Sequence, residues 1–144
     1  MREITVQRDI QAPRAAVWAV LADFPNISDW NTGVKASAAT SDVIEGLGAT
    51  RHCELSPMGG LHETIAGWTP ESQLVVQIDK ASKLPIKSAT VTFDLIEGDA
   101  ITTPTTVTYA YEAQLGMGPM LDRQLTKGFG GFLEDLEKAA SDRS

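Results

Sequence analysis

Apolar side chains alternate with polar ones over residues 3–10, which predicts a strand with one buried face. Ile4, Val6 and Ile10 share one parity, and Arg8 is the charged exception on it. The pattern changes after Pro13.

Helical spacing replaces the alternation from Pro13, whose missing N–H suits the first turn of a helix. Pro25 ends this helix, and residues 26–30 predict a second short helical turn before Gly33. The apolar residues of the first helix are Val17, Trp18, Val20 and Leu21.

Strand patterns separated by turn residues dominate the middle of the chain. Consecutive strands joined by short turns favour an antiparallel meander. Residues 34–41 are polar, so we expect this strand at an edge of the sheet. The predicted strands are 34–41, 49–55, 61–69, 73–80, 86–96 and 105–115.

Helical periodicity returns over residues 119–140. About 22 residues at 1.5 Å each span roughly 33 Å, enough to cross a whole sheet. The chain therefore predicts an α+β fold in a single domain over residues 1–144, with two short helices after the first strand and a long C-terminal helix. The apolar stripe of that helix comprises Leu121, Leu125, Phe129, Phe132, Leu133 and Leu136.

The composition of the chain limits the classes of partner and the compartment that we expect. A formal net charge of −7 disfavours nucleic acid and anionic membrane surfaces, because like charges repel. The single cysteine, Cys53, excludes an internal disulfide and fits a reducing compartment. The sequence shows neither a signal peptide nor a run of roughly 18 apolar residues. We therefore expect a cytoplasmic protein without stable membrane insertion, either a monomer or a homodimer.

Three local motifs, in this order and spacing, resemble the START-like helix-grip superfamily, which includes birch-pollen-allergen-like proteins and the polyketide cyclase/dehydrase and lipid-transport family. The resemblance implies a seven-stranded antiparallel sheet wrapped around the C-terminal helix, with a cavity between them. It implies no single activity, because the superfamily includes carriers, receptors and cyclases. The motifs are residues 10–13 running into Val17 and Trp18, residues 24–31, and residues 48–51 followed by Gly60 and Glu63.

Two charged residues have the parity of the cavity side. Arg51 shares its parity with Cys53 and Leu55, and Glu63 shares its parity with Ile65. A buried charge needs a partner, so we expect an Arg51–Glu63 ion pair. The pair is either a polar anchor that orients a carboxyl, hydroxyl or carbonyl group of an apolar ligand, or an ion pair at the sheet rim without a ligand role.

The other candidates lie on the inward parity of strands or on the helix stripe, where each is either a ligand contact or part of a solid core. Buried tyrosine hydroxyls seek partners, so Tyr109 and Tyr111 are candidates to bond a ligand. The full set of candidate ligand-binding residues is Arg51, Cys53, Leu55, Glu63, Ile65, Val76, Ile78, Val91, Phe93, Tyr109, Tyr111, Leu125 and Phe129.

Glycines interrupt the long helix at Gly128, Gly130 and Gly131, each at a cost of about 1 kcal/mol relative to alanine. Gly128 borders the apolar stripe, so it either leaves room in the cavity, allows another segment to approach closely, or permits a kink. The loop 56–60, with the apolar Met58, is either a lid or an ordinary hairpin turn.

Metal and cofactor motifs are missing from the sequence. His52 and His62 are the only histidines, and their parity points away from the cavity. A metal site needs three or four ligands, so we expect no metal and no cofactor.

Three functions remain open. The first is binding of a hydrophobic small molecule, lipid or polyketide-like, in the cavity. The second is a cofactor-independent enzyme of the polyketide cyclase/dehydrase type, with no catalytic residue identified. The third is a protein-interaction module, which an exposed apolar patch over residues 117–120 would favour.

Overall fold

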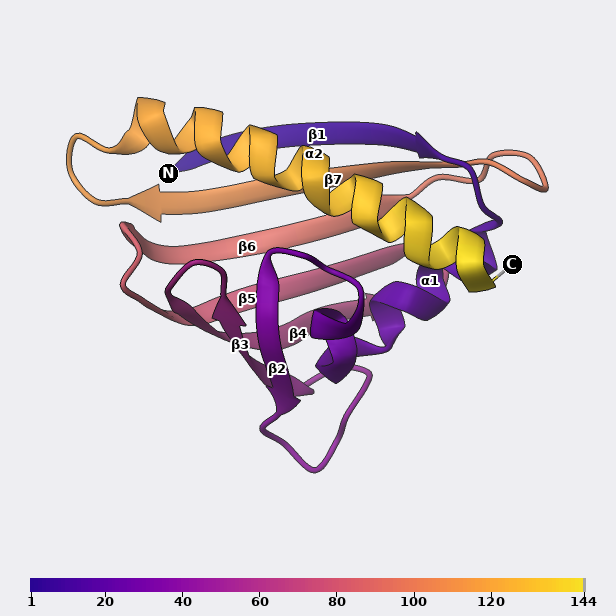
Figure 1. The fold of residues 1–144 in the computed structure, drawn as a ribbon, viewed down its shortest axis with the longest axis horizontal. Helices are drawn as coiled ribbons and strands as arrows, with labels where there is room; N and C mark the ends of the chain where they lie inside the picture. Colours follow the sequence, from indigo (N-terminus) through magenta and orange to yellow (C-terminus); the bar gives the residue numbers. More distant parts are fainter. Residues whose placement is uncertain (144) are drawn as a thin grey trace.

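A computed structural model describes residues 1–143; Ser144, the last residue of the expected domain, lies outside the described residues. Figure 1 shows one curved sheet with a long helix running diagonally across one face. The elements in chain order are β1 (Arg2–Ile10), α1 (Arg14–Ala22), η1 (Phe24–Asp29, a 3₁₀ helix), β2 (Val34–Ala39), β3 (Thr50–Leu55), β4 (Gly60–Thr69), β5 (Gln73–Ser82), β6 (Ile86–Leu95), β7 (Thr103–Ala113) and α2 (Gly118–Arg143).

The sheet has seven strands in the order β1-β7-β6-β5-β4-β3-β2, and the neighbours pair antiparallel. The predicted helix-grip arrangement is therefore confirmed, including the edge position of β2. Strands β2 to β7 form a meander, and the first strand, β1, pairs with the last strand, β7.

Several element bounds differ from the sequence prediction. Strand β7 begins at Thr103 and includes Pro104, which pairs with Asp9 near the end of β1. Helix α2 has 26 residues and extends past both predicted ends, and Gly118 at its start is buried against Arg2 of β1.

The N-terminal helices close one end of the sheet. Pro13 caps α1 with an extended backbone, and the helix buries its predicted apolar face. Trp18 packs edge-on against Trp68 of β4, with ring centroids 5.0 Å apart. Figure 1 shows α1 beside the C-terminal part of α2, and the two helices are in contact.

Helix α2 is attached to the sheet mainly near its two ends. Leu121, Leu133, Leu136 and Ala140 are buried, whereas Leu125 and Phe129, in the middle of the same stripe, are only half-buried. The middle of the helix therefore does not close against the sheet.

Polar contacts hold α2 at both ends. Arg2 and Tyr111 both donate to Asp122 near its start. Arg8 and the backbone N–H of Gln11 donate to Glu137 near its end. Arg8 thus keeps the predicted inward parity and reaches a partner at the rim. Within residues 1–143, no helix combines the length and apolar composition needed to cross a membrane.

Candidate functional site

A cavity of about 340 Å³ lies between the sheet and the middle of α2. Strands β2 to β7, helix η1, the segment after η1 and the β5–β6 turn all contribute to its wall. Its lining residues are Ile27, Asn31, Gly33, Val34, Arg51, Cys53, Leu55, Leu61, Glu63, Val76, Ile78, Leu84, Pro85, Ile86, Val91, Phe93, Tyr109, Leu121, Gln124, Leu125, Gly128, Phe129 and Phe132.

The structure brings most of the sequence-predicted site residues to this cavity. Ile65 is fully buried in the core and Tyr111 is fully buried near the start of α2, and neither contributes to the lining. Whether the lining residues bind a ligand stays a prediction. Those present in the wall are Arg51, Cys53, Leu55, Glu63, Val76, Ile78, Val91, Phe93, Tyr109, Leu125 and Phe129.

The Arg51–Glu63 ion pair expected from the parity is present. The two residues are direct partners in the β3–β4 register, and each is only 6% exposed. Arg51 Nε donates to Glu63 Oε1 at 2.9 Å, and Arg51 Nη1 donates to the carbonyl oxygen of Phe24 at 2.8 Å. The Arg51 guanidinium also stacks on the Phe24 ring, 3.8 Å from its centroid. Helix η1 therefore fixes this side chain from one side and Glu63 from the other.

Cys53 adjoins the ion pair. Its Sγ donates to Glu63 Oε1 at 3.3 Å. Burial, opposed by the charge of Arg51, raises the pKa of the Cys53 thiol to about 12. Because the thiolate is the nucleophilic form, Cys53 is a poor nucleophile at neutral pH.

The two tyrosines of β7 have different surroundings. The Tyr111 hydroxyl donates to Asp122 and to the Gly118 carbonyl oxygen, so it is engaged in holding α2. The Tyr109 hydroxyl makes no hydrogen bond within residues 1–143, and its ring packs on Phe129 with centroids 5.0 Å apart. Burial, with the charge of Glu63 adding to it, raises the pKa of Tyr109, so the phenol stays neutral.

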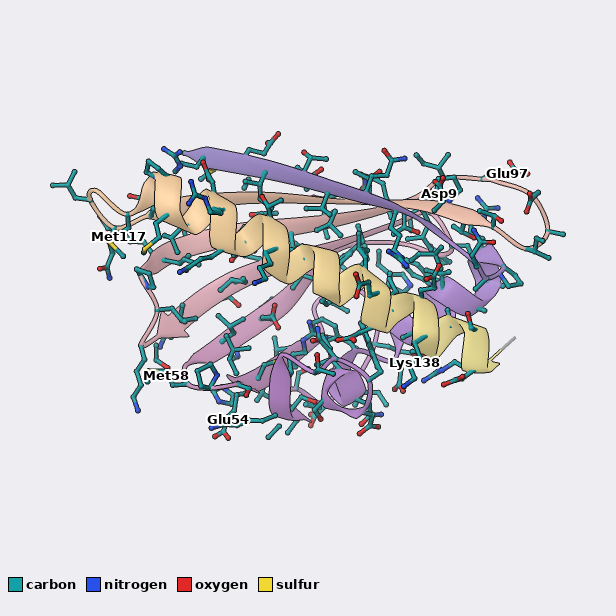
Figure 2. All side chains as sticks on the ribbon, turned by 45° about the horizontal axis from the view of Figure 1, so that its top comes forward. Asp9, Glu54, Met58, Glu97, Met117 and Lys138 are labelled. Atoms are coloured by element: carbon teal, nitrogen blue, oxygen red, sulfur yellow. The ribbon has the colours of Figure 1, made fainter. Side chains whose placement is uncertain are left out.

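The cavity opens beside the first half of α2. Gln124 and Gly128 are exposed although both contribute to the lining, and Leu84, Leu125 and Leu55 are half-buried there. Figure 2 labels Met58, in the β3–β4 turn, and Met117, before α2, toward the same end of the molecule. Met58 is 59% exposed and is not in the lining, so a lid role for its turn stays a prediction.

Gly128 faces open space. A Cβ atom built on Gly128, Gly130 or Gly131 meets nothing within 4 Å, which excludes close approach of another segment as the reason for these glycines. Only Gly128 of the three lies in the cavity wall, so only Gly128 fits the prediction that a missing side chain leaves room in the cavity.

Sequence reasoning missed several lining residues. Asn31 is 8% exposed, and its Oδ1 accepts a hydrogen bond from the Gly33 amide, a local turn that the Asn-x-Gly pattern could have indicated. Phe132 belongs to the predicted helix stripe but is not among the predicted ligand contacts. Leu84 and Pro85 lie in a turn, where strand parity gives no direction.

The histidines lie on the outer side of the sheet. His52 is exposed, and His62 pairs with Asp79 at 3.3 Å, outside the cavity lining. Among residues 1–143, no group of three or more His, Cys, Asp or Glu side chains is placed to hold a metal ion.

Comparisons with known proteins agree with this architecture. A family model described as "polyketide cyclase / dehydrase and lipid transport" matches residues 1–141. No curated protein matches the sequence.

Solved structures share the fold at low sequence identity. An aromatase/cyclase from Streptomyces sp. R1128 has a TM-score of 0.85 at 15% identity, covering 99% of this chain and 94% of that one. A START superfamily protein from Mycobacterium smegmatis has a TM-score of 0.83 at 13% identity, covering 99% of both chains. A truncated norcoclaurine synthase from Thalictrum flavum has a TM-score of 0.74 at 14% identity, covering 95% and 91%. With the match over residues 1–141, the chain belongs to the polyketide cyclase/dehydrase and lipid-transport family.

Proposed function

We propose that this protein binds a hydrophobic small molecule, lipid or polyketide-like, in the cavity between the sheet and α2. The observation that carries the proposal is the cavity itself, about 340 Å³ in size and open to solvent beside Gln124 and Gly128. Ligand sites of proteins measure about 300–1,000 Å³ and are mostly apolar with a few placed polar groups.

The wall supports this proposal by its composition. Aliphatic and aromatic side chains cover most of it, including Val76, Val91 and Phe93 from the central strands. Burying the apolar surface of a ligand there is favourable by about 25 cal/mol per Å². Arg51, Glu63 and Tyr109 place a few polar groups in this apolar wall, and such groups can orient a bound ligand.

The first experiment asks whether the cavity is occupied. Protein purified from its native host is analysed by native mass spectrometry, and any bound compound is extracted and identified. We expect a stoichiometric hydrophobic compound. A protein that carries none, and that also fails to bind apolar fluorescent dyes, would contradict the proposal and favour the protein-interaction alternative.

Neighbouring residues of β5 provide a matched pair of variants. Val76 lines the cavity, whereas Val75 points to the opposite face of the sheet and is half-buried over Gly67. We expect Val76→Phe to weaken binding of the extracted compound by at least about tenfold, because the ring occupies its space. Val75→Phe should leave the affinity unchanged. Equal effects of the two variants would place the compound elsewhere.

A second candidate is catalysis of the polyketide cyclase/dehydrase type in the same cavity. The observation that favours it is the neutral Tyr109 hydroxyl, which lacks a hydrogen-bond partner within residues 1–143 and faces a space that Glu63 also lines. A positioned phenol can donate a proton to an enolate oxygen, and a carboxylate can accept a proton.

One assay distinguishes an enzyme from a protein that only binds the compound. The protein is incubated with a linear poly-β-keto thioester, and cyclised products are followed by mass spectrometry. An enzyme should form product faster than buffer does, and Tyr109→Phe should slow it without weakening substrate binding. Product formation at the buffer rate by a protein that binds the thioester would identify a binder.

A further inference from the structure

The charges in the cavity wall cancel. Arg51 and Glu63 are the only charged residues among the lining residues, and they form a contact of 2.9 Å. A ligand that enters therefore meets no net charge. This balance restricts the class of ligand that the site can take.

Two of the three side-chain nitrogens of Arg51 are already engaged within the protein. Its Nε donates to Glu63, its Nη1 donates to Phe24, and its planar face lies on the Phe24 ring. Strong recognition of a carboxylate by arginine uses two parallel N–H bonds from one edge of the guanidinium. Only Nη2 is without a partner within residues 1–143, so the fork is already divided between two acceptors.

Glu63 adds a penalty for anions. Its Oε1 accepts from Arg51 and Cys53, and its Oε2 accepts no hydrogen bond within residues 1–143. A ligand carboxylate placed here would lie beside this negative charge, on a side chain that is only 6% exposed, which is costly. An ammonium group would face the positive charge of Arg51 for the same reason.

A hydroxyl or carbonyl group suits the same atoms. A ligand hydroxyl can donate to Glu63 Oε2 and accept from Arg51 Nη2. The neutral Tyr109 phenol, on β7, can donate to a second oxygen of the ligand. The free positions on Glu63 Oε2, Arg51 Nη2 and the Tyr109 hydroxyl are then satisfied without adding charge.

We infer that the cavity selects a neutral hydrophobic ligand with a hydroxyl or carbonyl oxygen at its buried end, and discriminates against fatty-acid-like anions. This inference rests on the proposed function, because it specifies the ligand of the same cavity.

Four probes of similar size test the inference at pH 7: 2-methylnaphthalene, 2-naphthol, 2-acetylnaphthalene and 2-naphthoate. Affinities are measured by tryptophan fluorescence, since Trp30 packs on the lining residue Phe132 with ring centroids 5.2 Å apart, and by calorimetry. We expect 2-naphthol and 2-acetylnaphthalene to bind at least about tenfold more tightly than 2-naphthoate.

Glu63→Gln should reverse this order. The amide oxygen of glutamine can still accept from Arg51, but the positive charge is no longer balanced. The affinity for 2-naphthoate should rise, so that the naphthol-to-naphthoate preference falls at least about tenfold. The control is Glu54→Gln, which removes the same charge from an exposed position of β3 that lies at the outer edge of the molecule in Figure 2; the preference should not change. Thermal unfolding checks that both variants are folded.

The outcomes are separable. If none of the four probes binds the wild-type protein, the proposed function fails and this inference fails with it. If the probes bind but 2-naphthoate is equal to or tighter than 2-naphthol, only the inference on ligand class is overturned. If Glu63→Gln does not fold, the comparison of the probes on the wild-type protein still tests the inference. A folded Glu63→Gln variant with an unchanged preference would also overturn the inference on ligand class.

Discussion

At the scale of single residues, the Arg51–Glu63 pair is buried, and burial limits what an ion pair adds to stability. Buried ion pairs often stabilise a protein no more than an apolar pair of equal volume, because both charges lose their water. Arg51 and Glu63 nevertheless stand in the wall of a cavity, each 6% exposed. The inference that the pair selects among ligands gives these two charges a role in binding.

Cys53 should be unreactive in the native protein. Since its pKa is raised to about 12, the thiol is protonated at pH 8. We expect negligible reaction with Ellman's reagent at pH 8 and complete reaction of the single thiol in guanidinium chloride. Native protein reacting as fast as unfolded protein would show that the thiol is accessible and ionised.

Residue parity on a strand predicts the direction of a side chain but not its partner. It correctly placed Arg51 beside Glu63, because both face the same side of adjacent strands. Parity also predicted that Tyr109 and Tyr111 both face the cavity. Only Tyr109 lines the cavity, since Asp122 of α2 occupies the Tyr111 hydroxyl. That difference depends on a long-range contact, which no local pattern contains.

At the scale of elements, the apolar stripe of α2 both packs into the core and lines the cavity. Its ends carry buried leucines and its middle carries Leu125, Gly128 and Phe129, which line the cavity. Periodicity predicted the stripe, but it could not separate the packed ends from the open middle. The separation follows from the curvature of the sheet, which is a property of all seven strands. The β5–β6 turn, with Leu84 and Pro85, escaped prediction because turns have no period.

The glycines of α2 allow a test of the cavity opening. A leucine side chain at position 128 would extend over the exposed edge of the cavity, whereas one at position 131 would extend into solvent. We expect Gly128→Leu to weaken ligand binding at least about fivefold and Gly131→Leu to leave it unchanged. Both should raise the free energy of unfolding by up to about 1 kcal/mol, because leucine has the higher helix propensity.

Ligand titration and urea unfolding of the two variants give both quantities. Unchanged binding by Gly128→Leu would show that the bound ligand does not reach this edge of the cavity. Lower stability of both variants would show that the glycines serve the helix itself.

At the scale of the whole molecule, contacts between β1 and α2 connect opposite ends of the described chain. Arg2 and Tyr111 both bond Asp122, and these bonds, led by that from Arg2, hold the pKa of Asp122 below its ordinary value of 3.8. A carboxylate with a lowered folded-state pKa stabilises the protein above its ordinary pKa. The contribution is lost as the pH falls through the folded value.

Asp122→Asn should therefore lower the free energy of unfolding at pH 7, and the difference from wild type should shrink as the pH falls toward 3. Urea unfolding at both pH values measures it. Asp42→Asn, in the exposed loop between β2 and β3, is the control and should have little effect at either pH. A difference that is equal at pH 7 and pH 3 would show that the charge of Asp122 is not involved.

The sheet order also determines when the molecule can be completed. Strands β3 to β7 each pair with the strand made just before, so the meander can grow as the ribosome extends the chain. Strand β1 is made first but pairs with β7, and it must wait unpaired until Thr103–Ala113 has emerged. Such distant pairings fold slowly. We therefore expect nascent chains that stop before β7 to expose an unpaired β1, which makes them candidates for chaperone binding.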